Sequence, residues 1–196
     1  MADIYDSAFR TILNDCRQLI IPIINISFGE HYTGNEQITL DQGEISKEVL
    51  TVEFPNTAVL YLRYAKTGTP DTYEYVIKTP GGSVNYNVPF FKTQQYTLDE
   101  IFEKNLLLLI PFYIFSKEAD FSEYEADSSR LEALKSEYQE IIERLEQLLQ
   151  DGRLSDFDRA TLIETANDVM KEIAKKYQNI VEGVGKVMGG ACHWHF

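Results

Sequence analysis

The sequence LEALKSEYQEIIERLEQL, residues 131–148, has an apolar side chain at every third or fourth position. These positions are Leu131, Leu134, Tyr138, Ile141, Leu145 and Leu148, and most residues between them are charged. Such a heptad-like stripe predicts an amphipathic helix with one apolar seam and one solvated face. This helix decides the fold, because most of its stability must come from whatever covers the seam.

A second helix is predicted directly after the first. Asp151-Gly152 ends the first helix, and Ser155 with Asp158 three residues later can cap the next one. Apolar side chains then continue at the same spacing at Leu162, Ala166, Val169, Ile173, Tyr177, Ile180 and Val184. The short connection predicts an antiparallel two-helix arm over residues 116–190. The apolar seams of the two helices can be buried against each other, against the preceding domain or against a second copy of the chain.

Two further helical segments are predicted before the arm. The apolar spacing in residues 5–28 favours a helix or a helix pair, which Pro22 ends or kinks. Thr97 and Glu100 have the spacing of a capping box, and the apolar residues that follow predict a core helix as far as Ile110.

Strands are predicted between these helical segments. Alternation in residues 50–54 indicates a half-buried strand, and the apolar run 58–62 is typical of a strand buried on both faces. Residues 72–78 and 84–91 flank a Pro-Gly-Gly-Ser turn, which predicts a β-hairpin. Pro89 should lie at a sheet edge or a strand end. The fold class is therefore α/β.

Composition limits the classes of function. The 196 residues carry a formal net charge of −13, and neither half is basic, which argues against non-specific DNA binding. The N-terminus lacks a signal-peptide pattern, and the longest apolar stretch, 106–115, is shorter than the roughly 20 residues of a membrane span. We therefore expect a cytoplasmic protein with no membrane role.

The histidines and cysteines suggest no catalytic triad, and Cys192 to Phe196 resembles a soft-metal cluster only superficially.

Sequence blocks that cover most of the chain point to a family. In order they are YDSAFR (5–10), LIIP (19–22), FGE (28–30), DQGEI (41–45), FPNTAVLYLR (54–63), TPGG (79–82), DEIFEK (99–104), IPFY (110–113) and VMGG (187–190). Together these blocks resemble the recombination-promoting nucleases, also described as PD-(D/E)XK nuclease family transposases. The resemblance implies a restriction-endonuclease-like sheet domain and a metal-dependent DNA endonuclease.

The resemblance also implies a cofactor and site residues. Family members use carboxylates to hold Mg²⁺, which polarises the phosphate and activates water. The one acidic residue that matches the family is Asp6, implied to be a catalytic and metal-binding group. The alternative is that Asp6 is a helix N-terminal charge that interacts with the helix dipole and with Arg10. DNA is the implied partner of the family, and Arg63, Lys66, Lys78 and Lys92 are candidate phosphate contacts.

The chain departs from the family where catalysis would occur. The loop 30–36 should lead into two catalytic strands with an Asp and a Glu-x-Gln, but residues 37–43 already resemble the helix that comes after them. The single Glu-x-Gln, Glu137 to Gln139, lies in the heptad helix, where Glu137 is interpreted as a solvated charge. A rebuilt acidic pair would have to come from the remaining candidates: Asp41, Glu44, Glu53, Asp71 and Glu74.

These observations predict a reduced nuclease-like α/β domain (1–115), a two-helix arm (116–190) and a divergent tail (191–196). Removal of two central strands should leave apolar sheet edges exposed. We expect a shortened family member that has lost catalysis and holds no Mg²⁺. The alternative is a non-catalytic interaction protein that uses residues 128–184 to bind a second copy, or to bind and modulate a full-length relative.

Overall fold

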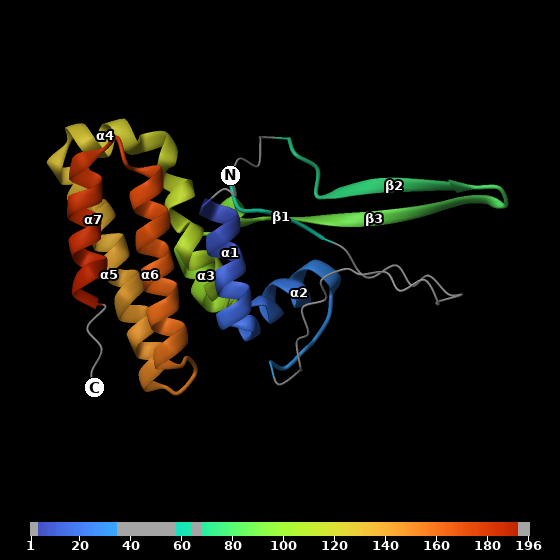
Figure 1. Ribbon diagram of the computed structural model, residues 1–196, viewed down its shortest axis with the longest axis horizontal. Helices are drawn as coiled ribbons and strands as arrows, with labels where there is room; N and C mark the ends of the chain where they lie inside the picture. Colours follow the sequence, from blue (N-terminus) through green and yellow to red (C-terminus); the bar gives the residue numbers. More distant parts are fainter. Residues whose placement is uncertain (1–3, 35–57, 64–67, 192–196) are drawn as a thin grey trace.

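A helical body and a long β-hairpin that projects from it make up the molecule (Figure 1). The computed structural model describes residues 4–34, 58–63 and 68–191. Over this part the chain has a mixed α/β fold in which helices predominate. The α/β class predicted from the sequence is thereby confirmed.

The N-terminal segment folds as a helix pair. α1 (Ile4–Asp15) is joined by the short 3₁₀ helix η1 (Arg17–Ile20) to α2 (Ile21–Phe28). Pro22 lies in the first turn of α2, where a backbone N–H has no intrahelical partner to lose. Gly29 ends α2 with a left-handed φ of 68°, a conformation that favours glycine.

The sheet contains three described strands in the order β1-β3-β2. Their bounds are β1 (Val59–Tyr61), β2 (Thr72–Thr79) and β3 (Gly82–Lys92). β2 and β3 pair antiparallel, and Thr79 lies opposite Gly82, so a two-residue turn closes the hairpin. β1 pairs with β3 in parallel. The predicted hairpin is confirmed.

β2 and β1 pair with successive parts of β3. β2 pairs with β3 as far as Pro89, and β1 pairs with the three residues that follow. Pro89 thus lies opposite the first residue of β2, at the end of that pairing. The prediction that 58–62 is buried on both faces is wrong, since Val59 is 39% exposed. Residues 50–54 lie outside the described part.

The apolar segment after the sheet is buried, but it is not one helix. Thr97 caps α3 (Leu98–Glu103) with the predicted capping box. The helix ends there because Asn105 has a left-handed φ of 56°. A 3₁₀ helix, η3 (Leu107–Asp120), follows and contains Pro111, which cannot donate a backbone hydrogen bond. The core position of this segment was predicted correctly and its helix type was not.

The C-terminal arm is a bundle of three long described helices rather than two. A short helix, α4 (Phe121–Ala126), leads into α5 (Ser128–Gln150), α6 (Asp156–Ile173) and α7 (Gln178–Ala191). α7 packs against both α5 and α6 (Figure 1). The predicted two-helix arm is therefore wrong at the end of α6, where the chain reverses direction.

The turn between α6 and α7 preserves the apolar spacing, which explains the error. The N–H of Tyr177 donates to the carbonyl of Ala174 at 2.7 Å and closes the turn. Tyr177 packs edge-on against Phe121, with ring centroids 5.3 Å apart, and Ile180 is buried. Because residues on both sides of the turn face the same core, the stripe continues without a glycine or proline to mark the break.

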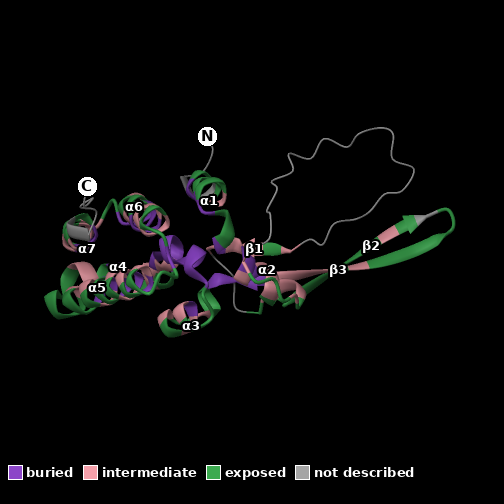
Figure 2. Cartoon of the chain, turned by 90° about the horizontal axis from the view of Figure 1, so that it is seen from below, coloured by how far each residue is buried: buried purple, intermediate pink, exposed green. Residues whose placement is uncertain are grey.

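The bundle covers the heptad seam from within the chain. The side chains of Leu134, Tyr138, Ile141, Leu145 and Leu148 are all buried, and they belong to a core that also contains α1 and η3. Buried residues gather in the helical body, whereas most of the hairpin is exposed (Figure 2). Of the alternatives for the seam, burial within the chain is observed. None of the described helices has the length and apolar character needed to cross a bilayer.

Candidate functional site

Asp6 lies in the first turn of α1, the helix that packs against α6. Its side chain is outside the described part of the structure. The metal-binding interpretation and the helix-dipole interpretation of Asp6 therefore both stay predictions.

The acidic residues that could rebuild a metal site do not converge where they are described. Asp71 is exposed, and its carboxylate lies 2.8 Å from Nζ of Lys92. Glu74 accepts a hydrogen bond of 2.6 Å from the side-chain amide of Asn85. Asp41, Glu44 and Glu53 lie outside the described residues. Among those described, no group of three or more His, Cys, Asp or Glu side chains could hold a metal ion.

Two of the candidate phosphate contacts are held in ion pairs within the fold. Nε of Arg63 donates to a carboxylate oxygen of Glu118 at 2.9 Å, and the guanidinium also lies over the ring of Phe115. The ammonium of Lys92 is almost fully buried between Asp71 and the carbonyl of Thr69. Lys78 is exposed on the hairpin, and Lys66 lies outside the described part.

Glu137 anchors the body and is not simply a solvated charge, which corrects the sequence interpretation. Its carboxylate lies 2.5 Å from Nζ of Lys117 and accepts a hydrogen bond of 2.8 Å from the phenol of Tyr113. Burial and the neighbouring Glu137 raise the pKa of Tyr113 well above its usual range. Burial likewise raises the pKa of Tyr138, which is fully buried next to Tyr113. Glu137 therefore joins α5 to η3.

Cys16 is a buried thiol between α1 and η1. Burial, reinforced by a hydrogen bond with Asp158, raises the pKa of Cys16 to about 12. A thiol held protonated in this way is a poor nucleophile and a poor metal ligand. The tail from Cys192 to Phe196 lies outside the described part.

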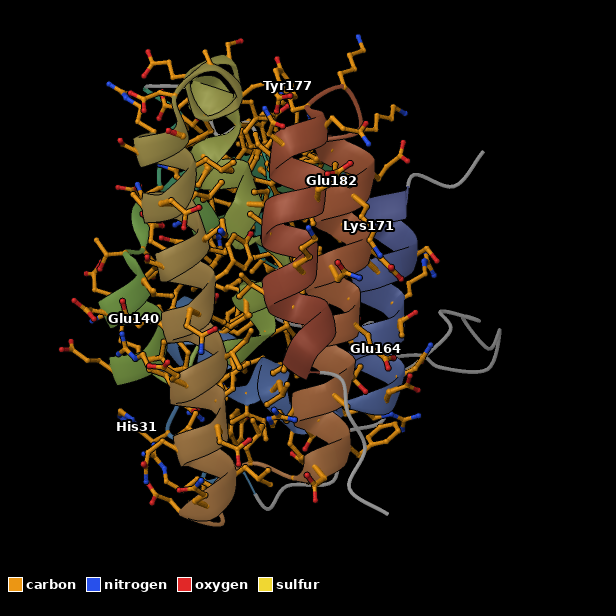
Figure 3. The ribbon with its side chains drawn as sticks, turned by 90° about the vertical axis from the view of Figure 1, so that its left-hand side faces the viewer. His31, Glu140, Glu164, Lys171, Tyr177 and Glu182 are labelled. Carbon is orange, nitrogen blue, oxygen red and sulfur yellow. The ribbon has the colours of Figure 1, made fainter. Side chains whose placement is uncertain are left out.

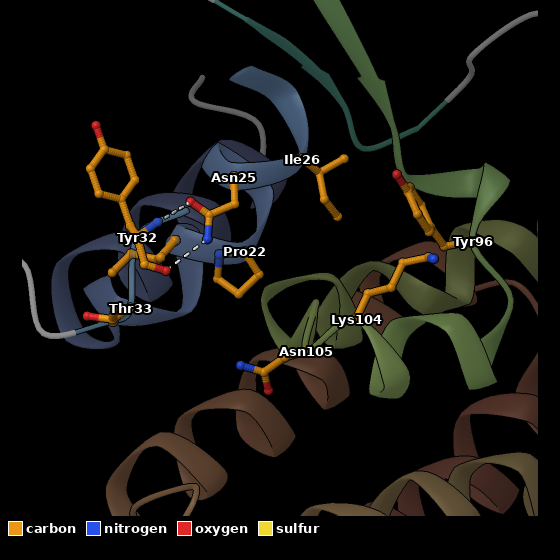
Figure 4. Close-up of a pocket in the computed structure, with 10 residues that line it drawn as sticks. Pro22, Asn25, Ile26, Tyr32, Thr33, Tyr96, Lys104 and Asn105 are labelled. Carbon is orange, nitrogen blue, oxygen red and sulfur yellow. Dashed lines mark hydrogen bonds between the residues drawn. The ribbon is translucent and has the colours of Figure 1, made fainter. Parts of the chain in front are cut away.

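A pocket of about 540 Å³ opens between α2 and the segment around α3 (Figure 4). Asn25 shapes one wall, because its side chain binds both backbone groups of Tyr32 at 2.9 and 3.0 Å. Lys104 and Asn105 form the opposite wall, where α3 ends. The pocket is therefore built by α2 and the loop after it on one side and by the end of α3 on the other.

The lining of this pocket is suited to binding rather than to bond cleavage. It combines the ammonium of Lys104 and the amide of Asn105 with the apolar side chains of Pro22 and Ile26. Sequence reasoning missed the pocket because it placed Lys104 and Asn105 inside a continuous helix. The left-handed conformation of Asn105 creates the wall, and asparagine is one of the residues that tolerate it.

The arm has a second hollow, of about 530 Å³, on the outer surface where α5, α6 and α7 meet. Ile142 and Val187 contribute apolar surface, while Glu143 and Lys186 contribute charge. The exterior of the bundle is charged, and Glu140, Glu164, Lys171 and Glu182 lie on its outer faces (Figure 3).

Comparisons with known proteins identify no relative of this chain. No family model matches it, and searches of curated proteins and of solved structures find no match. The family that the sequence blocks resemble therefore stays a prediction, and the geometry of the described residues is what bears on function.

Proposed function

We propose that this chain is a shortened, non-catalytic member of the recombination-promoting nuclease family. In this proposal, metal-dependent DNA cleavage is the activity of the full-length relatives, and this chain does not perform it. The observation that carries the proposal is the pairing of Arg63 with Glu118 and of Lys92 with Asp71.

These pairs matter because of what phosphodiester cleavage requires. Mg²⁺ takes carboxylate oxygens in a near-octahedral set, and cations must be free to meet the phosphate. Asp71 and Glu74 are bound to separate partners on the hairpin, so they do not fit a shared metal ion. Arg63 and Lys92 are each bound to a carboxylate. The negative charge of that carboxylate offsets the positive charge with which each side chain would bind a phosphate.

Plasmid nicking by the purified full chain tests the proposal. Supercoiled plasmid would be incubated in Mg²⁺ or Mn²⁺, with a chelator and the Asp6→Ala variant as controls. We expect no conversion to open circles above the chelator control. Metal-dependent nicking that Asp6→Ala abolishes would show a working site and contradict the proposal.

The second hollow, on the arm, favours a second candidate function. A partner helix that binds residues 128–184 cannot use the heptad seam, because the chain itself buries it. The hollow beside Ile142 and Val187 offers apolar surface with charges of both signs nearby, and an amphipathic helix can match both. In this alternative the chain binds and modulates a full-length relative.

Co-purification with an intact family member tests this alternative. A tagged full-length relative should retain the wild-type chain. Ile142→Glu should abolish retention, because it replaces apolar surface of the hollow with a charge. Glu140→Gln, on the exposed face of the same helix, is the matched control and should bind as wild type does. Equal retention of both variants would show that this hollow is not the binding site.

A further inference from the structure

The projecting hairpin has one apolar face that the body leaves exposed. Side chains of paired residues lie on the same face of a sheet, and the register pairs Tyr73 with Val88, Tyr75 with Tyr86 and Ile77 with Val84. We call these six residues the aromatic face. Tyr73, Tyr75 and Val84 are 54%, 55% and 58% exposed, whereas Ile77, Tyr86 and Val88 are half-buried.

The reverse face of the hairpin is mainly polar, although it includes Val76, which pairs with Asn85 and is 46% exposed. Glu74 pairs across the strands with Asn87, and Lys78 pairs with Ser83. An antiparallel ribbon with one apolar and one polar face is expected to bury the apolar one. Here the polar face and much of the aromatic face are both open to water.

At the base of the hairpin, the body buries the other side of the sheet. Phe91, which pairs with Leu60, is buried in the core. By alternation, Phe90 and its neighbour Val59 continue the aromatic face, and Val59 is exposed. Among the described residues, the partly exposed apolar surface thus extends from the hairpin into β1, where the sequence predicted burial on both faces.

We propose that the aromatic face is the interface of a homodimer, in which the hairpins of two copies pack face to face. Sheets pack in this way at about 10 Å, with side chains from the two faces interdigitated. A two-fold axis through the hairpins would bring each aromatic face against the same face of the second copy.

Charge and shape favour a second copy as the occupant. The chain carries a net charge of −13, yet none of the six residues of the aromatic face is charged. The hairpin projects away from the helical body, so two copies can join there while their acidic bundles stay apart (Figure 1). Contact at this face therefore avoids the like-charge repulsion that contact between the bodies would meet.

The exposed area predicts a weak dimer. A tyrosine offers about 200 Å², and Tyr73 and Tyr75 are each about half exposed, so the aromatic face and its continuation leave roughly 500 Å² per copy. Two copies would bury roughly 1,000 Å², below the size of a standard stable interface. We therefore expect the monomer–dimer midpoint on the order of 10–100 µM.

Sedimentation velocity over a concentration series that spans this midpoint tests the proposal. Wild-type chain should shift from monomer to dimer as concentration rises. The Tyr73→Thr/Tyr75→Thr double variant keeps a strand-favouring residue at both positions and should weaken dimerisation by more than about tenfold. The matched control, Glu74→Thr/Lys78→Thr on the reverse face of the same strand, should dimerise like wild type.

Three results would overturn the proposal. Wild-type chain could stay monomeric throughout, or the tyrosine variant could dimerise as wild type does. The tyrosine variant could also lower the thermal midpoint of dilute monomer, which would mean that the chain's own residues cover the face. None of these readouts depends on nuclease activity, so the dimer and the proposed function stand or fall separately.

Discussion

Glu137 shows how a single residue in a charged stripe can differ from its neighbours. Its carboxylate joins α5 to η3 through Lys117 and Tyr113, and only a third of its side chain is exposed. Glu137→Gln can keep the hydrogen bond from Tyr113 but cannot neutralise Lys117. We expect the variant to lower the free energy of unfolding by about 1–2 kcal/mol, measured by urea denaturation.

Glu132→Gln on the same helix is the control for this prediction. Glu132 forms an ion pair with Lys135, but two thirds of its side chain is exposed. Its replacement should change stability by less than about 0.5 kcal/mol, since exposed ion pairs contribute little. Equal losses in the two variants would contradict the anchoring role of Glu137.

The tyrosines at the same junction predict a loss of stability at alkaline pH. The pKa values of Tyr113 and Tyr138 are raised above the ordinary value near 10, so the unfolded state releases these protons first. Stability should be unaffected by these groups below pH 10 and should fall as pH rises above it. Thermal unfolding from pH 8 to 11 measures the fall.

Tyr138→Phe separates this effect from general alkaline unfolding. It removes the buried phenol while keeping the ring, so the decline in thermal midpoint above pH 10 should become shallower. Tyr75→Phe on the exposed hairpin is the control and should leave the slope unchanged. Equal slopes in both variants would show that Tyr138 is not linked to unfolding.

At the scale of elements, α7 is helical despite several glycines. Its contacts with α5 and α6 must offset their low helix propensity. A Cβ added at Gly185 would meet nothing closer than 3.9 Å. Gly185→Ala should therefore raise the free energy of unfolding by about 0.5–1 kcal/mol in urea denaturation. A loss of stability would show that α7 does not pack as described.

Local signals predicted the elements whose ends the sequence marks chemically. Thr97 begins α3, Ser155 begins α6, and the Pro-Gly turn closes the hairpin. Breaks without such marks were missed. The chain turns at Ala174 with the apolar spacing intact, and α3 ends before Asn105 although apolar residues continue beyond it.

The candidate site was less predictable than the fold, because partner choice is a tertiary property. Nothing in the spacing of Arg63 and Glu118, or of Lys92 and Asp71, indicates that they pair. The pocket beside Asn25 likewise depends on α2 and the end of α3, which are far apart in sequence. Side-chain type indicates which residues could bind a phosphate or a metal ion. Only the packing determines which of them already form ion pairs within the fold.

At the scale of the whole molecule, the helical body and the hairpin differ in what they leave exposed. The body buries its apolar seams and forms ion pairs such as Lys117 with Glu137. The hairpin leaves an uncharged aromatic face in water. This contrast is the basis for the dimer that we propose.

Plasmid nicking below and above the proposed dimer midpoint is the most direct test of the loss of catalysis. Supercoiled plasmid would be incubated with the full chain in Mg²⁺ and in Mn²⁺ over that range of protein concentration. We expect the plasmid to stay supercoiled at every concentration. Nicking that requires the metal and is lost in Asp6→Ala would contradict the proposed loss of catalysis.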